Sequence, residues 1–339
     1  MNKHRKLSDH ISGQTGRSKL TTTVVLLLVW LAAGGILINE QRLFDYLKLR
    51  GYHPPQAVVN LARQDTLTPA AEHLFYLNKP GILPTVTSFR QFCPENEDTI
   101  VLGCYHSSEN GIYVYDVPDP ALAGVQQVTA AHETLHAAYG RLGSSEKTSV
   151  NRMLQDYYDH GLTDAQVKSE IGIYMKTEPN AIVDEMHSIF GTEVGSLPAP
   201  LEAYYRRYFS DRSKIISYRD QYQAQFTQRQ NTIAEDDKQL TSIKSAIDAQ
   251  QSSIDTQLNQ IGTERSRING YLRNNQTEDY NAAVPGFNAA IDSYNTTVQS
   301  LRSKIDSYNQ LVAARNQVAG QLSILDKALD TRTTTTVPQ

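Results

Sequence analysis

A heptad repeat in the C-terminal third of the chain is the feature that most restricts how this sequence can fold. Apolar residues recur in steps of seven at Ile233, Leu240, Ile247, Ile254, Ile261 and Ile268. A second run has steps that alternate between four and three, and its members are Tyr280, Val284, Phe287, Ile291, Tyr294, Val298, Leu301, Ile305, Tyr308 and Val312. Both spacings are typical of α-helices that pack along a coiled-coil seam.

The turn-like stretch RNNQT between the two runs predicts that they form one antiparallel helical hairpin over residues 211–330. Pro285 falls in phase with the second run, so we expect it to bend that helix rather than end it. The alternative is a polar, partly disordered tail. The final residues, 331–339, read TRTTTTVPQ and are expected to form a disordered tail in either case.

The N-terminus has the composition of a membrane anchor. Residues 21–38 read TTTVVLLLVWLAAGGILI, and this uncharged run is just long enough for a membrane-spanning helix. Residues 1–20 are basic, although the whole chain has a net charge of -4. The positive-inside rule therefore predicts a single-pass protein of the cell membrane, with a cytoplasmic N-terminus and an extracytoplasmic remainder. A cleaved signal peptide is the alternative, but its apolar region is usually shorter.

The chain has two cysteines, Cys93 and Cys104, and both follow the predicted anchor. An oxidising compartment favours a disulfide between them. The alternative is a pair of free, buried thiols.

Between the anchor and the hairpin lies the part of the chain with the patterning of a folded domain. Residues 39–60 contain GYHPPQ and are interpreted as a connector, whereas residues 61–210 have mixed apolar patterning and most of the histidines. No basic surface large enough to indicate a nucleic-acid partner is present. The sequence also lacks a Gly-rich phosphate loop and a nucleophile elbow.

The stretch AAHETLHAAYG, residues 130–140, places two imidazoles and a carboxylate in an otherwise apolar segment. When residues 125–142 are projected as a helix, His132 and His136 lie one turn apart and Glu133 lies next to them. Two histidines with this spacing can share one zinc ion, and the glutamate between them takes a proton from the metal's water. The alternative is a pair of core histidines, which would need partners for four ring nitrogens.

A catalytic zinc needs a third protein ligand. The extended motif with a third histidine is excluded, because Tyr139 and Leu142 stand where it requires glycine and histidine. A later segment of helical spacing, NAIVDEMHSIFGTEV, contains Glu185. With HETLH and DEMHSIFGTE, the chain resembles the gluzincins, the peptidase MA-like zinc metallopeptidases.

The resemblance implies an α+β fold, a zincin-like domain that is mainly helical with a small sheet. It also implies that Glu185 is the third zinc ligand. Glu193 is the second candidate for that ligand, or a residue that orients a ligand histidine, and Asp184 is another candidate for the orienting role. The chain departs from the family at Ile189, where an aspartate is common.

A peptidase also needs a group that stabilises the oxyanion of the tetrahedral intermediate. His187 and Tyr204 are the main candidates, and Tyr174 and Tyr205 are further ones. Core packing is the alternative for the tyrosines of LEAYYRRYF. The stretch GIYVYDV predicts a strand, either an edge strand that pairs with an extended substrate or an ordinary internal strand.

These features together predict a membrane-anchored, extracytoplasmic zinc metallopeptidase that hydrolyses peptide bonds, with Zn2+ activating a water and Glu133 as general base. One alternative is a membrane-tethered coiled-coil structural or interaction protein with an inactive zincin-like domain. Another is a zinc amidase that acts on cell-wall peptides. The expected partners are a protein or peptide substrate, the membrane through residues 21–38, and a coiled-coil partner or a second copy of the chain.

Overall fold

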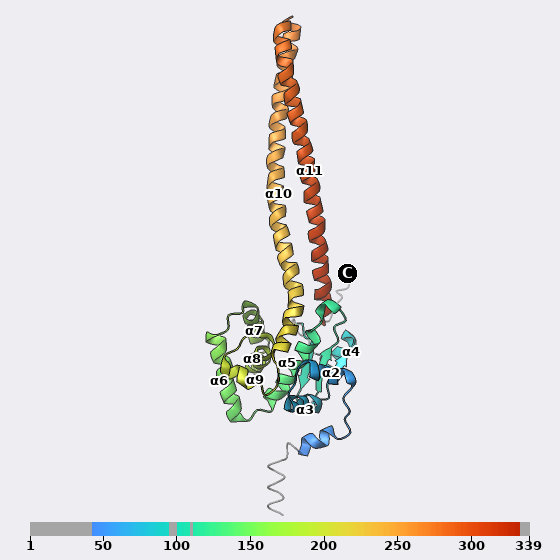
Figure 1. Ribbon diagram of the computed structural model, residues 1–339, viewed down its shortest axis with the longest axis vertical. Helices are drawn as coiled ribbons and strands as arrows, with labels where there is room; N and C mark the ends of the chain where they lie inside the picture. Colours follow the sequence, from blue (N-terminus) through green and yellow to red (C-terminus); the bar gives the residue numbers. More distant parts are fainter. Residues whose placement is uncertain (1–42, 95–99, 109–110, 333–339) are drawn as a thin grey trace, which may run out of the picture.

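Two long helices, α10 (Ser213–Arg273) and α11 (Thr277–Leu329), project side by side from a smaller domain (Figure 1). This computed structural model describes residues 43–94, 100–108 and 111–332. Residues 43–49 are helical, and Pro120–Leu122 form the short 3-10 helix η1. The other helices of the domain are α2 (Gln56–Gln64), α3 (Pro69–Leu77), α4 (Val86–Phe92), α5 (Val125–Gly140), α6 (Ser144–His160), α7 (Ala165–Thr177), α8 (Ile182–Glu193) and α9 (Ala199–Tyr205).

The strands form one small sheet in the order β1-β3-β2. β1 (Gly81–Leu83) is parallel to β3 (Gly111–Tyr115), and β2 (Gly103–His106) is antiparallel to β3. Ile112 and Val114 of β3 are fully buried, as expected for a strand with neighbours on both sides. The segment GIYVYDV is therefore an internal strand, and its interpretation as an edge strand is wrong.

Helix α5 is the centre of the domain and packs against α8, the sheet, α3 and the first turns of α10. Ala130, Ala131 and Ala137 are fully buried on α5, and their small side chains let neighbouring elements approach closely. On α8, a Cβ atom added at Gly191 would overlap the buried side chain of Leu135. This close contact fixes α5 and α8 relative to each other, which matters because these two helices hold the predicted ligands.

Helices α10 and α11 form the long helical hairpin that the heptads predict. Asp237 near the base of α10 pairs with Arg315 at 3.0 Å, and Gln250 further along donates a hydrogen bond to the backbone of Thr297 at 2.9 Å. A later residue of α10 therefore contacts an earlier residue of α11, which means that the two helices run antiparallel. Helix α11 continues through Pro285 rather than ending there, as predicted.

The end of α11 returns to the domain. Leu325 is buried with Leu122 and with Val125, the first residue of α5. Beyond the helix, the hydroxyl of Thr331 donates a hydrogen bond to the carbonyl oxygen of Val101 at 2.6 Å. Thr331 is buried, so the tail predicted to be disordered from residue 331 begins with an ordered residue.

The predicted α+β fold class is wrong. The strands contain only three, four and five residues, whereas α10 alone contains 61, so the described chain is mostly helical. The predicted transmembrane helix, residues 21–38, lies outside the described residues. Within the part of the chain that the structure describes, no helix combines the length and the apolar character needed to cross a membrane. The predicted connector also ends earlier than expected, because α2 begins at Gln56 and places Val58 in the core.

Candidate metal centre

Two helices supply the side chains that could hold a metal ion. Helix α5 places His132 and His136 one turn apart, and α8 places Glu185 in its first turn. Nε2 of His132 is 3.7 Å from Oε2 of Glu185, and Nε2 of His136 is 3.5 Å from Oε1. One ligand atom from each residue lies within 4.8 Å of the others. The three predicted ligands therefore form a group that could bind a metal ion.

Asp184 fixes the orientation of one of these histidines. Nδ1 of His136 donates a hydrogen bond to Oδ1 of Asp184 at 2.9 Å. With Nδ1 engaged by Asp184, Nε2 is the ring nitrogen that faces Glu185 and that would bind a metal ion after losing its own proton. This contact is the one expected of a residue that orients a ligand histidine.

The group has a strong preference for positive charge. Burial alone would lower the pKa of His136, but its hydrogen bond to Asp184 and the charges of Glu185 and Glu133 raise it to about 9. Burial alone would raise the pKa of Glu185, but the hydrogen bond from His132 and the charges of both histidines hold it below its usual value. The ring of His136 therefore binds a proton tightly in the metal-free protein, and a metal ion would have to displace that proton.

Glu133 lies beside this group without belonging to it. Its side chain is buried, with only 6% of the residue exposed, and it forms no hydrogen bond within the described part of the chain. Burial raises the pKa of Glu133, and the charges of His136 and His132 partly offset that effect. The oxygens of Glu133 are not among the fully buried, unbonded side-chain atoms of the described chain, and the residue lines the cavity beside the ligand group.

A cavity of about 370 Å³ opens beside the group and is lined by His132, Glu133 and Glu185 together with Tyr174 of α7. Strand β2 forms part of its wall. A Cβ atom added at Gly103 of β2 would lie 2.8 Å from Oε1 of Glu133, so only glycine lets the strand pass this close to the carboxylate. Gly103 is not among the residues predicted for the site, although a glycine inside a strand is a signal of close backbone approach.

The structure does not bring the two main oxyanion candidates to this cavity. His187 is fully buried, and its Nε2 lies 2.9 Å from the hydroxyl oxygen of Tyr204. Burial lowers the pKa of His187 to about 3, so the ring is neutral. The hydroxyl of Tyr205 donates a hydrogen bond to the backbone of His187 at 2.7 Å. These residues form a buried aromatic cluster, which is the packing alternative, and Tyr174 is the oxyanion candidate that lines the cavity.

Glu193 is also absent from the ligand group. It follows Glu185 by eight residues on α8, which separates the two along the helix axis by about 12 Å. Glu193 instead lines a second cavity, of about 230 Å³, which also reaches His132 and Glu133.

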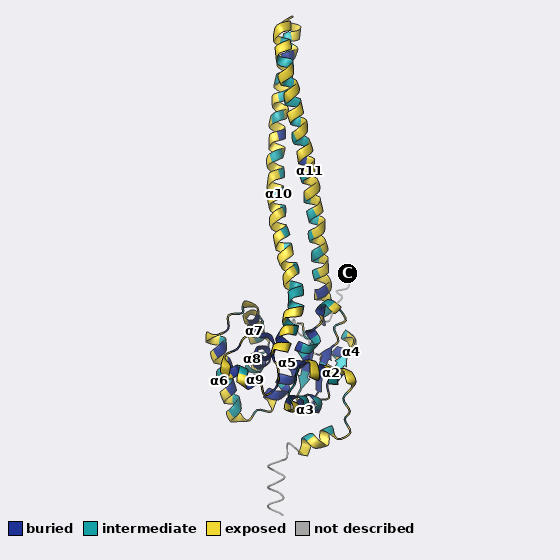
Figure 2. Cartoon of the chain, in the orientation of Figure 1, coloured by how far each residue is buried: buried dark blue, intermediate teal, exposed yellow. Residues whose placement is uncertain are grey.

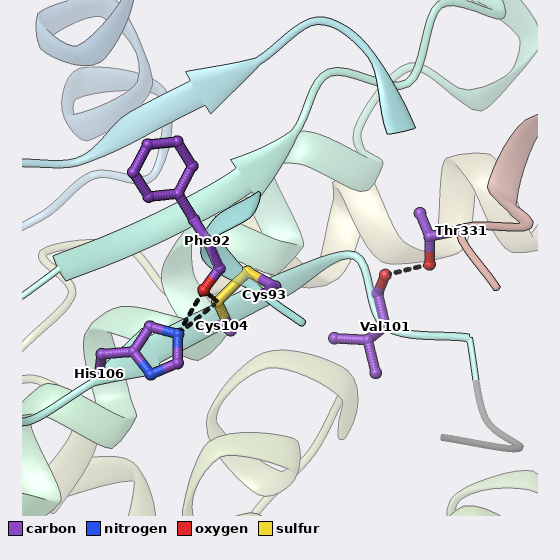
Figure 3. Close-up of a disulfide and its surroundings, with 6 residues drawn as sticks. All are labelled: Phe92, Cys93, Val101, Cys104, His106 and Thr331. Atoms are coloured by element: carbon purple, nitrogen blue, oxygen red, sulfur yellow. Dashed lines mark hydrogen bonds between the residues drawn. A yellow bond between two sulfur atoms is a disulfide. The ribbon is translucent and has the colours of Figure 1, made fainter. Parts of the chain in front are cut away.

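The predicted disulfide between Cys93 and Cys104 is confirmed (Figure 3). It joins the end of α4 to β2, the strand next to Glu133. Nε2 of His106 donates a hydrogen bond to the carbonyl oxygen of Phe92 at 2.6 Å, which adds a second link between the same two segments. Cys93, Cys104 and His106 form a second group of possible metal ligands. Because the two sulfur atoms are bonded to each other, that group offers no thiolate to a metal ion.

The chain matches no protein-family model, no curated protein and no solved structure. Its function is therefore inferred from the site itself.

Proposed function

We propose that the protein is a zinc metallopeptidase of the gluzincin type, with His132, His136 and Glu185 as ligands and Glu133 as general base. The observation that carries this proposal is the place of Glu133, which is buried, unpaired and directly beside three convergent ligand atoms without being one of them. A structural zinc site normally has four protein ligands, and it has no use for such a carboxylate.

The donor set fits zinc. Imidazole and carboxylate are both zinc ligands, and a site with three protein ligands leaves a position open for catalysis. Two ligands about 2.0–2.1 Å from one ion at tetrahedral corners are about 3.4 Å apart. The histidine nitrogens lie 3.5 and 3.7 Å from the two different oxygens of Glu185, and one ligand atom from each residue lies within 4.8 Å of the others, so a small rearrangement would bring them to that spacing. A zinc ion held there would polarise the scissile carbonyl and lower the pKa of a water molecule to about 7.

The residues around the ligands would transfer the proton, stabilise the oxyanion and bind the peptide. Glu133 accepts the proton of the attacking water and then delivers it to the leaving amine. Its burial favours this role, because a raised pKa makes the carboxylate a stronger base. Tyr174 lines the same cavity, and its hydroxyl would donate to the developing oxyanion. β2 is the edge strand beside the cavity, which supports its pairing with an extended peptide.

The proposed location is the extracytoplasmic side of the cell membrane. The disulfide supports it, since such bonds persist in oxidising compartments. The basic N-terminal sequence supports the same orientation.

An interaction function for the hairpin is the second candidate. Helices α10 and α11 contain 61 and 53 of the 339 residues, and a hairpin of this size favours binding to a further helical partner or to a second copy of the chain. A cell-wall amidase would use the same ligands and the same base, so it differs from the main proposal in substrate alone.

The test compares wild-type protein with the variant Glu133→Gln, both purified without chelators. We expect about one zinc per chain in both, because glutamine keeps the shape of residue 133 and the ligands are intact. Hydrolysis of unfolded protein substrates should fall at least about 10²-fold in the variant, the usual scale for a general base. Wild-type protein that contains no zinc and takes up none would contradict the proposal.

A further inference from the structure

The first helix of the described chain, residues 43–49, presents an apolar face to the surroundings. Leu43, Phe44, Tyr46 and Leu47 keep 48%, 65%, 66% and 52% of their surface exposed. Positions 43, 44 and 47 lie on one side of a helix and position 46 lies beside them, so the four side chains form one patch. Folded domains seldom leave several large apolar side chains together without a surface that covers them.

The opposite face of this helix is attached to the domain. Asp45 forms an ion pair with Arg141, the residue that follows α5. Asp45 and Leu49 lie one turn apart and are the partly buried residues of the helix. The apolar patch therefore points away from the domain, and within the described residues no other segment covers it.

Positive charges border the patch. Lys48 and Arg50 are both exposed, at the end of the helix and just after it. Partial burial and the charges of Arg141 and Lys79 lower the pKa of Lys48, so these three cations lie near one another. Asp45 is the acid beside them, and it is already paired with Arg141. An apolar face bordered by lysine and arginine is typical of a helix that lies in the headgroup region of an anionic membrane.

The sequence before this helix indicates which surface covers the patch. The uncharged run of residues 21–38, which is expected to cross the membrane, ends five residues before Leu43. Five residues span at most about 18 Å, even when fully extended. A membrane crossed by residues 21–38 is therefore within reach of the patch in every copy of the protein.

We propose that residues 43–50 lie on the membrane surface and hold the domain against it. Leu43 and Leu47 enter the boundary between headgroups and acyl chains, Tyr46 lies at headgroup level, and Lys48 and Arg50 contact anionic lipids. This inference rests on the proposed membrane location and is independent of the peptidase activity.

The docking sets the orientation of the whole molecule. Residues 43–49 lie at the end of the domain opposite to the hairpin (Figure 1). Arg141, which holds this helix, follows His136 by five residues, or about 7.5 Å along the axis of α5. Helix α10 is about 90 Å long and extends in the other direction. The candidate metal centre is thus held near the membrane, and the tip of the hairpin is directed away from it.

The first experiment identifies the side chains that enter the bilayer. The full chain is reconstituted in vesicles of phosphatidylcholine and phosphatidylglycerol with brominated acyl chains, which quench nearby tryptophan. Trp30 is the single tryptophan, so Trp30→Phe is combined with either Leu47→Trp or Leu49→Trp. We expect at least about threefold stronger quenching for Leu47→Trp, because an interfacial helix buries only its apolar face, by about 5–10 Å. The positions are two residues apart, so distance from the anchor does not explain this difference.

The second experiment measures the orientation of the hairpin. Cys93 and Cys104 are bonded to each other, so Leu272→Cys provides a unique thiol for a fluorescent dye near the tip. Energy transfer from this dye to a labelled lipid should be at background level in otherwise wild-type protein. Phe44→Ser combined with Leu47→Ser should raise the transfer, because the domain is then held by the anchor alone and can tilt.

The matched control is Ile173→Ser combined with Met175→Ser, which removes two exposed apolar side chains from α7. It should leave the energy transfer at background level.

Equal quenching at positions 47 and 49, or strong energy transfer from position 272 with the patch intact, would overturn the inference. Blue-shifted emission at position 47 without quenching would assign the patch to a second copy of the chain instead. Protein that does not sediment with the vesicles would contradict the proposed membrane location and this inference with it. Protein without zinc or hydrolytic activity would contradict the peptidase proposal alone, because neither fluorescence measurement depends on catalysis.

Discussion

The domain and the α10–α11 hairpin are both helical, but they exclude water to very different degrees (Figure 2). In the domain, Leu135, Ile171 and Phe190 are 0% exposed. Along the hairpin above its base, the most buried residues are Ile254, Ile268 and Leu301, which keep 7%, 7% and 8% of their surface exposed. Most other seam residues of the hairpin are only partly buried.

This difference in burial reflects two different roles of helices in the molecule. In the domain, close packing on several sides leaves each side chain one position, and the arrangement of His132, His136 and Glu185 depends on that precision. In the hairpin, each helix has one neighbour and a polar outer face, so length and direction are defined while most side chains remain free. Substitutions should therefore have large effects in the domain and small ones along the hairpin.

The largest expected effect is at the ligand group. Glu185→Ala should weaken zinc binding at least about 100-fold, because it removes a direct ligand, whereas loss of an orienting residue costs 10–100-fold. Glu193→Ala, two turns along the same helix, should keep zinc bound. Zinc titration against a competing chelator measures both. Loss of zinc in Glu193→Ala with retention in Glu185→Ala would reverse the ligand assignment.

Gly191→Ala tests the packing between α5 and α8. The added methyl group would overlap Leu135 and Tyr205, which are both fully buried and have no room to move. Overpacking of this kind should lower the free energy of unfolding by about 1–3 kcal/mol. Thermal unfolding followed by circular dichroism measures the change. An unchanged melting temperature would show that the domain is less tightly packed than its contacts imply.

The pH dependence of zinc binding tests the charge preference of the site. In the metal-free protein the pKa of His136 is raised to about 9, above its usual value of 6.5, so a proton occupies the ring at neutral pH. Metal and proton compete, and apparent affinity should fall about tenfold for each pH unit below that pKa. Asp184→Asn removes the negative charge of the acceptor and so weakens the effect that raises the pKa of His136, and zinc affinity should therefore level off at a lower pH. Identical pH profiles for the two proteins would rule out this role of Asp184.

The smallest effect, and one of opposite sign to Gly191→Ala, is expected on the hairpin. Gly262 lies in the interior of α10, and a Cβ atom there would meet nothing within 4 Å. Gly262→Ala should therefore stabilise the helix by about 0.8–1 kcal/mol, the difference in helix propensity. The measurement is the unfolding midpoint of the hairpin helices. Destabilisation at Gly262 would mean that another surface covers this face of α10.

The features that could be predicted from the sequence are those that depend on the spacing of residues close together in the chain. The steps of seven predicted the two long helices, and the i, i+4 histidines with Glu185 predicted a group that the structure assembles. Cys93 and Cys104 followed from their number and from the expected compartment.

The features that the sequence could not supply depend on contacts between distant segments. His187 and Tyr204 had the right chemistry, but their helices turn them into an aromatic cluster. Gly103 faces Glu133 only because β2 passes beside α5, an arrangement that no local pattern encodes. The predicted α+β fold class was wrong because the strands contain far fewer residues than the helices.

The return of the chain to the domain has a consequence for how this protein can vary. Leu325 packs against the domain, and Thr331 forms a hydrogen bond to it, close to the start of α10. The hairpin is therefore an insertion whose two ends are both attached to the domain. Removing seven residues from each helix would shorten the excursion by about 10 Å and restore the same seam. The distance that the tip reaches is thus separable from the ligand group at the base, and related chains can differ in hairpin length while they keep the same three residues, His132, His136 and Glu185.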